Sequence, residues 1–172
     1  MRAVLLLALF AAPVLAQGRH NTAAPIDFGA DTIELQDRAN RAVLSGSVTV
    51  RQADMSLAAA RMTVAYTGQV VGGNPQVARL DASGGVTVRR PDQTARASYA
   101  IYDLNRRVIT MLGAVTLTQG SNTVNGGRLT INLDTGRAVI DGSSVGSRGA
   151  AGGATTTRGG RVTGTFSVPD RR

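Results

Sequence analysis

The sequence predicts an all-β fold built from stacked strand repeats. The segment Leu44–Arg51 (L-S-G-S-V-T-V-R) returns as Ala82–Arg89 and as Leu112–Thr118, with a truncated fourth copy at Ile140–Gly142. The repeated glycines stand at 46, 84, 113 and 142, so the spacings are 38, 29 and 29 residues. A period of this size indicates supersecondary units that bury their apolar faces by stacking. Because no long stretch of the sequence has a helical period, we expect almost no helix.

Alternating side chains define the individual strands. In the first copy, Ala42, Leu44, Gly46, Val48 and Val50 fall on one face, and the intervening polar residues fall on the other. At equal distances after the glycines, inward apolar positions recur as Met62/Val64/Tyr66, Ala100/Tyr102/Leu104 and Leu129/Ile131/Leu133. This period of two predicts strands there and argues against a helix through the three alanines 58–60.

Shorter strands and turns complete the prediction. We expect short strands at 26–28, 32–36 and 55–57, and a last one within 161–168. The first repeat is longer than the others, which predicts a loop between Thr67 and Gln76.

The first 16 residues form a predicted signal peptide. Arg2 supplies a positive charge, residues 3–12 an apolar core, and Val14-Leu15-Ala16 a cleavage site before Gln17. The apolar stretch is shorter than the roughly 20 residues that span a bilayer, which favours cleavage and release into the periplasm. The predicted mature chain consists of a loose N-terminal arm (17–24), a β domain (25–142), a Gly/Ser/Thr-rich linker (143–160) and a last strand with a tail (161–172).

Composition narrows the function classes. The chain has no Cys, so disulfides and thiolate chemistry are excluded. Its formal charge of +8 comes from Arg alone, and half of the excess lies in residues 143–172. Nucleic-acid binding would need aromatic platforms among the arginines, and only 3% of the residues are aromatic, so we expect no nucleic-acid partner. His20, the single histidine, lies in a polar stretch and is predicted to be solvated and mobile.

The sequence offers little for catalysis. It has no His/Asp/Glu cluster at metal-ligand spacing and no glycine-rich phosphate loop that leads into a helix. The acids are nearly all Asp at turn positions, where their ordinary role is to form the turn. We therefore predict that the protein is not an enzyme and has no catalytic residue, metal or cofactor.

The repeated apolar stripe is the remaining functional feature. It is either an ordinary dry core or the lining of a groove between two apolar faces, and the pattern alone does not choose between them. A groove of this kind would hold acyl chains without a polar anchor, because burial contributes about 0.8 kcal/mol per CH₂.

The N-terminal part of the β domain resembles the opening of the LptA/OstA-like family. Pro25–Asp31 (P-I-D-F-G-A-D) and Ala42–Gln52 (A-V-L-S-G-S-V-T-V-R-Q) are similar to the family's P-I-x-I-x-A-D strand and its later a-x-F-x-G-N-V-x-V-x-Q-G. Departures from that pattern occur at Phe28, Leu44, Ser47 and Ala53.

Two later stretches extend the resemblance to about residues 25–142. Val108–Gly120 is similar to the family's L-x-G-n-V-x-L-x-q-g segment, and Val124–Leu133 to its i-x-G-d-x-l-x-y-d-l segment. The order and spacing of the four stretches make the resemblance specific.

The resemblance implies an open, twisted antiparallel β-jellyroll that stacks end to end in the periplasm and bridges the inner and outer membranes. Lipopolysaccharide or a related glycolipid would move along its groove with the acyl chains inside and the phosphorylated sugars outside. An ATPase at the inner membrane would supply the energy. The implied acyl-contact residues are Leu44, Val48, Val50, Met62, Val64, Met111, Val115, Leu117, Leu129 and Ile131.

The resemblance also implies protein partners at both ends. The strand with Ile26, Asp27 and Phe28 would add onto an inner-membrane LptC-like partner by strand pairing. The C-terminal edge, near 137–142 or 162–168, would meet the next copy or an outer-membrane LptD-like protein. Two alternatives stay open: an LptC-like subunit that keeps its membrane anchor, and a structural β-repeat protein of the envelope with a dry core.

Overall fold

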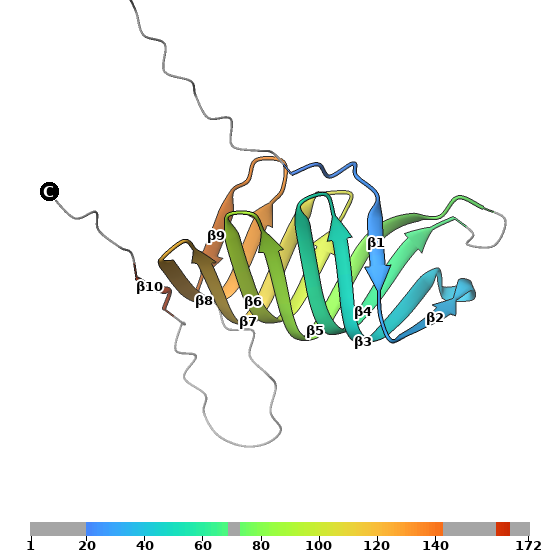
Figure 1. Ribbon diagram of the computed structural model, residues 1–172, viewed down its shortest axis with the longest axis horizontal. Helices are drawn as coiled ribbons and strands as arrows, with labels where there is room; N and C mark the ends of the chain where they lie inside the picture. Colours follow the sequence, from blue (N-terminus) through green and yellow to red (C-terminus); the bar gives the residue numbers. More distant parts are fainter. Residues whose placement is uncertain (1–19, 69–72, 143–160, 166–172) are drawn as a thin grey trace, which may run out of the picture.

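The computed structural model describes residues 20–68, 73–142 and 161–165 (Figure 1). In these ranges it contains one antiparallel sheet of ten strands and a short 3-10 turn, η1 (Asp37–Ala39). The predicted all-β jellyroll is confirmed. The strands are β1 (Ile26–Gly29), β2 (Thr32–Gln36), β3 (Arg41–Gln52), β4 (Met55–Thr67), β5 (Gln76–Arg90), β6 (Gln93–Asp103), β7 (Val108–Gln119), β8 (Asn122–Asn132), β9 (Ala138–Asp141) and β10 (Thr163–Thr165).

The strands follow one another as a meander, and both edges of the sheet are split. Strands β3 to β8 pair in chain order. At one edge, β2 pairs with residues 41–45 of β3 and β1 pairs with residues 49–52 of the same strand. At the other edge, β9 pairs with residues 128–131 of β8 and β10 pairs with residues 123–125. Two short strands at each edge therefore cover the two halves of one long strand.

The repeated glycines bend the long strands at β-bulges. Gly46 in β3, Gly84 in β5 and Gly113 in β7 have φ of 75°, 83° and 81°, and the residue after each also has positive φ. The strand register shifts at each of these positions. A bulge bends its strand and interrupts the alternation of side chains. Gly46 was expected to lie on the inward face, but it lies in a bulge instead.

The bends fold the sheet onto itself. Residues 48–59, 86–97 and 115–126 form one half, named here the hairpin half. Residues 41–45, 61–67, 76–83, 99–112 and 128–141 form the other half, named here the turn half.

In Figure 1 the hairpins β3–β4 and β5–β6 and the β8–β9 turn all lie along the upper edge, opposite the bends. The molecule is therefore a trough that is closed along the bends. The line where hairpins and turns meet is called here the seam.

The core lies between the two halves. Val48, Val86 and Val115 from the hairpin half and Met62 and Leu129 from the turn half belong to one buried cluster. Each of them is at most 1% exposed, whereas most outward residues of the same strands are polar or at least partly exposed, with Val43 of β3 as a buried exception. The apolar, buried face of the sheet is thus mainly the inner one, as alternation along the strands predicts.

Several elements differ in detail from the expectation. The predicted strands at 55–57 and 61–66 are parts of one continuous strand, β4, which changes register between Ala58 and Arg61. The loop between Thr67 and Gln76 is present, although residues 69–72 are outside the described part. The expected last strand is observed as β10, and the rest of its predicted span, 166–168, is outside the described residues, as are the predicted signal peptide and linker.

Candidate functional site

The ten predicted acyl-contact residues all lie on the inner side of the trough. Nine are buried members of the core cluster, and Leu117 is partly buried against it. Their neighbours in the cluster include Val88 and Ala95 of the hairpin half and Leu80 and Ile109 of the turn half. The structure thus brings the predicted set together from both halves, in or against one buried apolar cluster.

The seam is closed at one place by a hydrogen bond between the two halves. Tyr102, near the end of β6 in the turn half, donates its hydroxyl to Oε1 of Gln52, at the end of β3, at 2.7 Å. Gln52 is 2% exposed and Tyr102 is 1% exposed. A buried bond of this kind holds the halves together, because separating them would leave two buried polar groups without partners.

His20 belongs to the same buried network, which corrects the prediction that it is solvated and mobile. Its side chain is fully buried, and its Nδ1 lies 2.6 Å from Oδ1 of Asp54 in the β3–β4 hairpin. Its Nε2 lies 3.4 Å from Oε1 of Gln52. The Gln52 amide in turn donates to the carbonyl oxygens of Thr22 and Ala24 at 3.0 and 3.1 Å.

These contacts hold residues 20–24, which were predicted to form a loose arm. Figure 1 shows the segment before β1 running along the upper edge of the trough, toward the β8–β9 turn. The arm therefore covers part of the seam.

The network changes the ionisation of two of its members. The hydrogen bond from His20 is the main reason that the pKa of Asp54 is lowered, and the more distant charge of Arg90 acts in the same direction. Burial raises the pKa of Tyr102 to about 12, because an ionised phenol is poorly solvated there. Asp54 is therefore held as a carboxylate and Tyr102 as a neutral hydrogen-bond donor at neutral pH.

An open cleft of about 590 Å³ lies on the seam beside this network. On one side it is lined by Asp54 and by the β5–β6 hairpin, residues 90–93. On the other side it is lined by Leu133, Thr135 and Gly136 of the β8–β9 turn and by Ala138, the first residue of β9. Leu117 and Gln119 of β7 complete the lining. Of the predicted acyl-contact residues, only Leu117 lines the cleft.

The predicted partner edge is an exposed edge of the sheet. Ile26 packs against the core, Asp27 is exposed, and Phe28 is 36% exposed. The neighbouring strand β2 presents Ile33 and Leu35, which are 51% and 57% exposed. At the opposite edge, Val139 of β9 and Val162 before β10 are 44% and 43% exposed. Both ends of the trough therefore carry exposed apolar side chains.

Neither a metal-binding cluster nor a membrane-spanning helix occurs in the described residues. They contain no group of three or more His, Cys, Asp or Glu side chains arranged to hold a metal ion. No helix in the part of the chain that the structure describes has the length and hydropathy needed to cross a bilayer.

Comparison with protein families identifies the chain. Residues 28–137 match the family described as LptA/(LptD N-terminal domain) LPS transport protein, and this span covers more than half of the sequence. The chain belongs to this family. The resemblance inferred from the strand motifs is confirmed, and the family is one of lipopolysaccharide transport proteins.

Individual proteins are similar to this chain in sequence or in fold. An uncharacterized protein of Rhizobium meliloti (strain 1021) is 33% identical over 121 residues, which are 68% of this chain and 65% of that protein. The match therefore spans slightly less than two thirds of the relative's length. LptH, the LptA-homologous periplasmic component of the lipopolysaccharide transport device of Pseudomonas aeruginosa, has a similar fold, with a TM-score of 0.67 at 18% identity. The alignment covers 87% of this chain and 99% of LptH.

Proposed function

We propose that this protein is a periplasmic carrier that binds lipopolysaccharide, holds its acyl chains between the two halves of the sheet, and passes it from the inner toward the outer membrane. The family assignment supports transport of lipopolysaccharide as the general role. The observation that carries the specific proposal is the inner face of the trough, which is apolar from the first long strand to the last. In this role the protein needs no catalytic residue, because its task is to offer a surface.

The inner residues suit saturated chains. Leu44, Val64, Met111 and Val115 are aliphatic or thioether side chains, and flexible Met side chains adapt to ligands of irregular shape. In the described structure the two halves pack directly against each other, so acyl chains would enter by separating them. Each buried CH₂ contributes about 0.8 kcal/mol, so a few chains would offset the loss of contacts between the halves.

The location of the polar contacts supports opening at the seam. The halves are covalently continuous at the bends, whereas at the seam they are joined by the hydrogen bond of Tyr102 with Gln52. We infer that the trough opens along the seam, with the acyl chains inside and the sugars outside.

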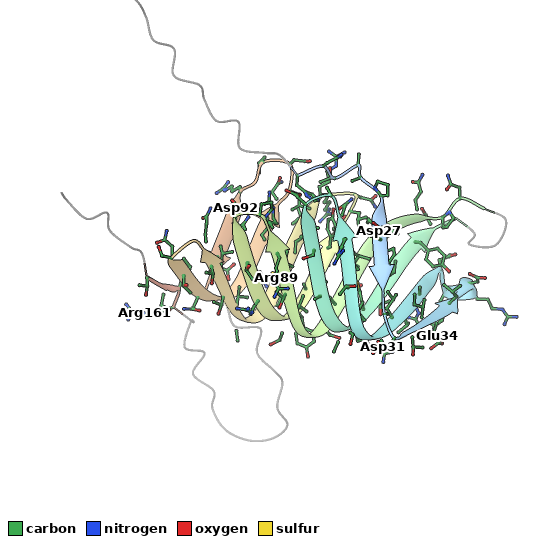
Figure 2. The ribbon with its side chains drawn as sticks, in the orientation of Figure 1. Asp27, Asp31, Glu34, Arg89, Asp92 and Arg161 are labelled. Atoms are coloured by element: carbon green, nitrogen blue, oxygen red, sulfur yellow. The ribbon has the colours of Figure 1, made fainter. Side chains whose placement is uncertain are left out.

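The ends of the trough are the proposed docking sites for protein partners. At the N-terminal edge, β1, β2 and the residues between them carry three acids, Asp27, Asp31 and Glu34, and no Arg. At the C-terminal edge, Arg137 precedes β9 and Arg161 precedes β10, and Asp141 ends β9. Figure 2 shows Asp27, Asp31 and Glu34 at one end of the molecule and Arg161 at the other. Opposite charges and exposed apolar strands at the two ends favour head-to-tail association by strand pairing.

The same edges would serve the other partners. We propose that the acidic N-terminal edge pairs with an inner-membrane LptC-like protein, and that the C-terminal edge pairs with a further copy or an outer-membrane LptD-like protein. The LptC-like alternative predicts a membrane-bound chain that keeps residues 1–16. N-terminal sequencing separates the two, because a cleaved carrier begins at Gln17 and fractionates with the periplasm.

Lipid analysis of the purified protein tests the function. The tagged protein is isolated from the periplasm without detergent, extracted, and the extract is analysed by mass spectrometry. We expect lipopolysaccharide or a related glycolipid in the extract and none in that of an unrelated periplasmic β protein treated identically. A lipid-free preparation that also fails to bind added glycolipid would favour the structural β-repeat alternative.

A further inference from the structure

We propose that the cleft on the seam binds the phosphate-bearing head group of a lipid, and that Arg90 is the residue that contacts the phosphate. This inference rests on the proposed function and adds a specific site to it. Nothing in the family assignment indicates which residue would recognise the head group.

The lining of the cleft suits an amphiphile. Its apolar part includes Leu133, which is fully buried in the core, and Leu117, which packs against the core cluster. Its polar part includes Gln93, Gln119 and Thr135 from the hairpins and the β8–β9 turn. The cleft therefore joins the apolar interior to a polar rim at the surface. A ligand that bridges them has an alkyl portion and a polar head group.

The charged groups of the cleft favour an anionic head group. Among the described residues of the lining Arg90 is the only cation, and its Nε is buried without a hydrogen-bond partner. The two acids of the lining already have partners. Asp54 contacts His20 at 2.6 Å, and Asp92 accepts a hydrogen bond from the Gln119 amide at 3.4 Å. The donor that still lacks a partner thus belongs to the cation.

Asp92 and the Nε of Arg90 differ in their exposure to water. Asp92 is exposed, and Figure 2 places it at the upper edge of the trough, where solvent and salt screen its charge. The Arg90 Nε is shielded from water, so its interaction with an anion is screened less. Guanidinium groups also form two parallel hydrogen bonds with a phosphate, which a Lys does not.

The position of the cleft fits the path of the lipid. It lies on the seam, where the acyl chains would be inside the trough and the sugars outside. A phosphate at the junction of chains and sugars would lie at the level of Arg90. The site would therefore fix the depth of the head group while the chains occupy the interior.

Two adjacent arginines provide a matched test. Arg90 lines the cleft, whereas Arg89 is exposed on the other face of the same strand (Figure 2). Arg90→Gln and Arg89→Gln change the net charge equally. Binding is measured for diphosphorylated lipid A, for the same lipid A after removal of both phosphates, and for inorganic phosphate as a competitor. Circular dichroism verifies that both variants are folded.

The expected results are specific. The unmodified chain binds diphosphorylated lipid A roughly tenfold more tightly than the dephosphorylated form, as a charge-assisted hydrogen bond predicts. Arg90→Gln abolishes this preference, Arg90→Lys retains part of it, and Arg89→Gln leaves it within twofold. Inorganic phosphate competes only weakly, because it lacks the alkyl portion.

Each other outcome has a distinct meaning. Equal binding of both lipids by the unmodified chain, or equal effects of the two Gln variants, would overturn the head-group site but leave the carrier function intact. Complete displacement by dilute inorganic phosphate would show a site for the free anion and overturn the lipid assignment. Failure to bind either lipid would overturn both this inference and the proposed function.

Discussion

Tyr102 and Gln52 join the two halves of the sheet across the seam. The phenol of Tyr102 donates to Oε1 of Gln52 at 2.7 Å, and the two residues are 50 positions apart in the chain. The amide of Gln52 also donates to the carbonyl oxygens of Thr22 and Ala24, so one side chain holds both the seam and the N-terminal arm. Opening the trough at this point breaks the bond between Tyr102 and Gln52, whereas the bonds from Gln52 to the arm do not cross the seam.

The Tyr102 phenol predicts a loss of stability at high pH. Its pKa is raised to about 12 in the folded protein, mainly by burial, so folding favours the protonated form. The contribution of the Tyr102 phenol to the free energy of unfolding is fully present below pH 10 and is lost as the pH rises toward 12. The free energy of unfolding should fall by up to about 2 kcal/mol over this range. Denaturant titrations at several pH values measure it.

Tyr102→Phe is the control for that pH dependence. It should lower the free energy of unfolding by roughly 1–2 kcal/mol at neutral pH, because Gln52 loses a buried donor. Its decline between pH 10 and 12 should be smaller than that of the unmodified chain. Parallel curves for the two proteins would mean that Tyr102 does not ionise as described.

His20→Ala should release the N-terminal arm. The change removes the contact with Asp54 and should reduce stability by roughly 1–2 kcal/mol. Hydrogen exchange should increase in residues 22–26 and remain unchanged in β7 and β8. The Asp54 carboxylate has a lowered pKa, so its contribution is present above its ordinary pKa and is lost as the pH falls through the lowered value. The difference between the two proteins should therefore shrink below about pH 4. Unchanged exchange in the arm would contradict the proposed attachment.

Two adjacent glycines in the β5 bulge separate steric fit from backbone strain. A Cβ on Gly84 would lie 2.7 Å from the Cβ of Ala60, whereas a Cβ on Gly85 would meet no atom within 4 Å. Both residues have positive φ. Gly84→Ala should cost about 3 kcal/mol from strain and overpacking, and Gly85→Ala about 1 kcal/mol from strain alone.

The equivalent bulge positions support this ranking. Ser47 and Ala114 follow the glycines of β3 and β7 and keep positive φ without being glycine. Thermal unfolding of the two variants measures the difference, and equal destabilisation would mean that contact with Ala60 is unimportant.

Association through the ends predicts a position-dependent effect of added charge. Leu35→Asp on β2 places a carboxylate on an exposed apolar residue of an edge that is already acidic. It should weaken self-association at least tenfold in sedimentation experiments. Tyr99→Asp is the matched control, because Tyr99 is 58% exposed but lies on the outer face of the central strand β6. Equal effects of both variants, or a chain that stays monomeric at every concentration, would exclude end-to-end contacts through β2.

Local patterns predicted most of the fold. Alternation identified the inward positions in 61–66 and 129–133, because a strand exposes its two faces in turn and only one is apolar here. The repeated glycines identified the period but not the bend. In a bulge, two residues of one strand lie opposite a single residue of the neighbouring strand. A glycine has no side chain whose polarity would reveal this interruption, so Gly46 was placed on the inner face.

The seam network could not be predicted from local patterns. The contacts of His20 with Asp54 and of Tyr102 with Gln52 join residues 34 and 50 positions apart. Tyr102 was recognised as inward but not as a donor across the seam, and His20 lies in a polar stretch that gives no sign of burial. The cleft also depends on this folding, because it forms only where the β5–β6 hairpin meets the β8–β9 turn.

Site-specific photo-crosslinking tests the central claim most directly. A photoreactive amino acid is placed at Val64 or Leu117 on the inner side and at Tyr99 on the outer face, and each folded variant is irradiated with lipopolysaccharide. Binding of acyl chains between the halves predicts crosslinked lipopolysaccharide at Val64 and Leu117 and none at Tyr99. Crosslinks at Tyr99 alone, or at none of the three positions, would contradict it.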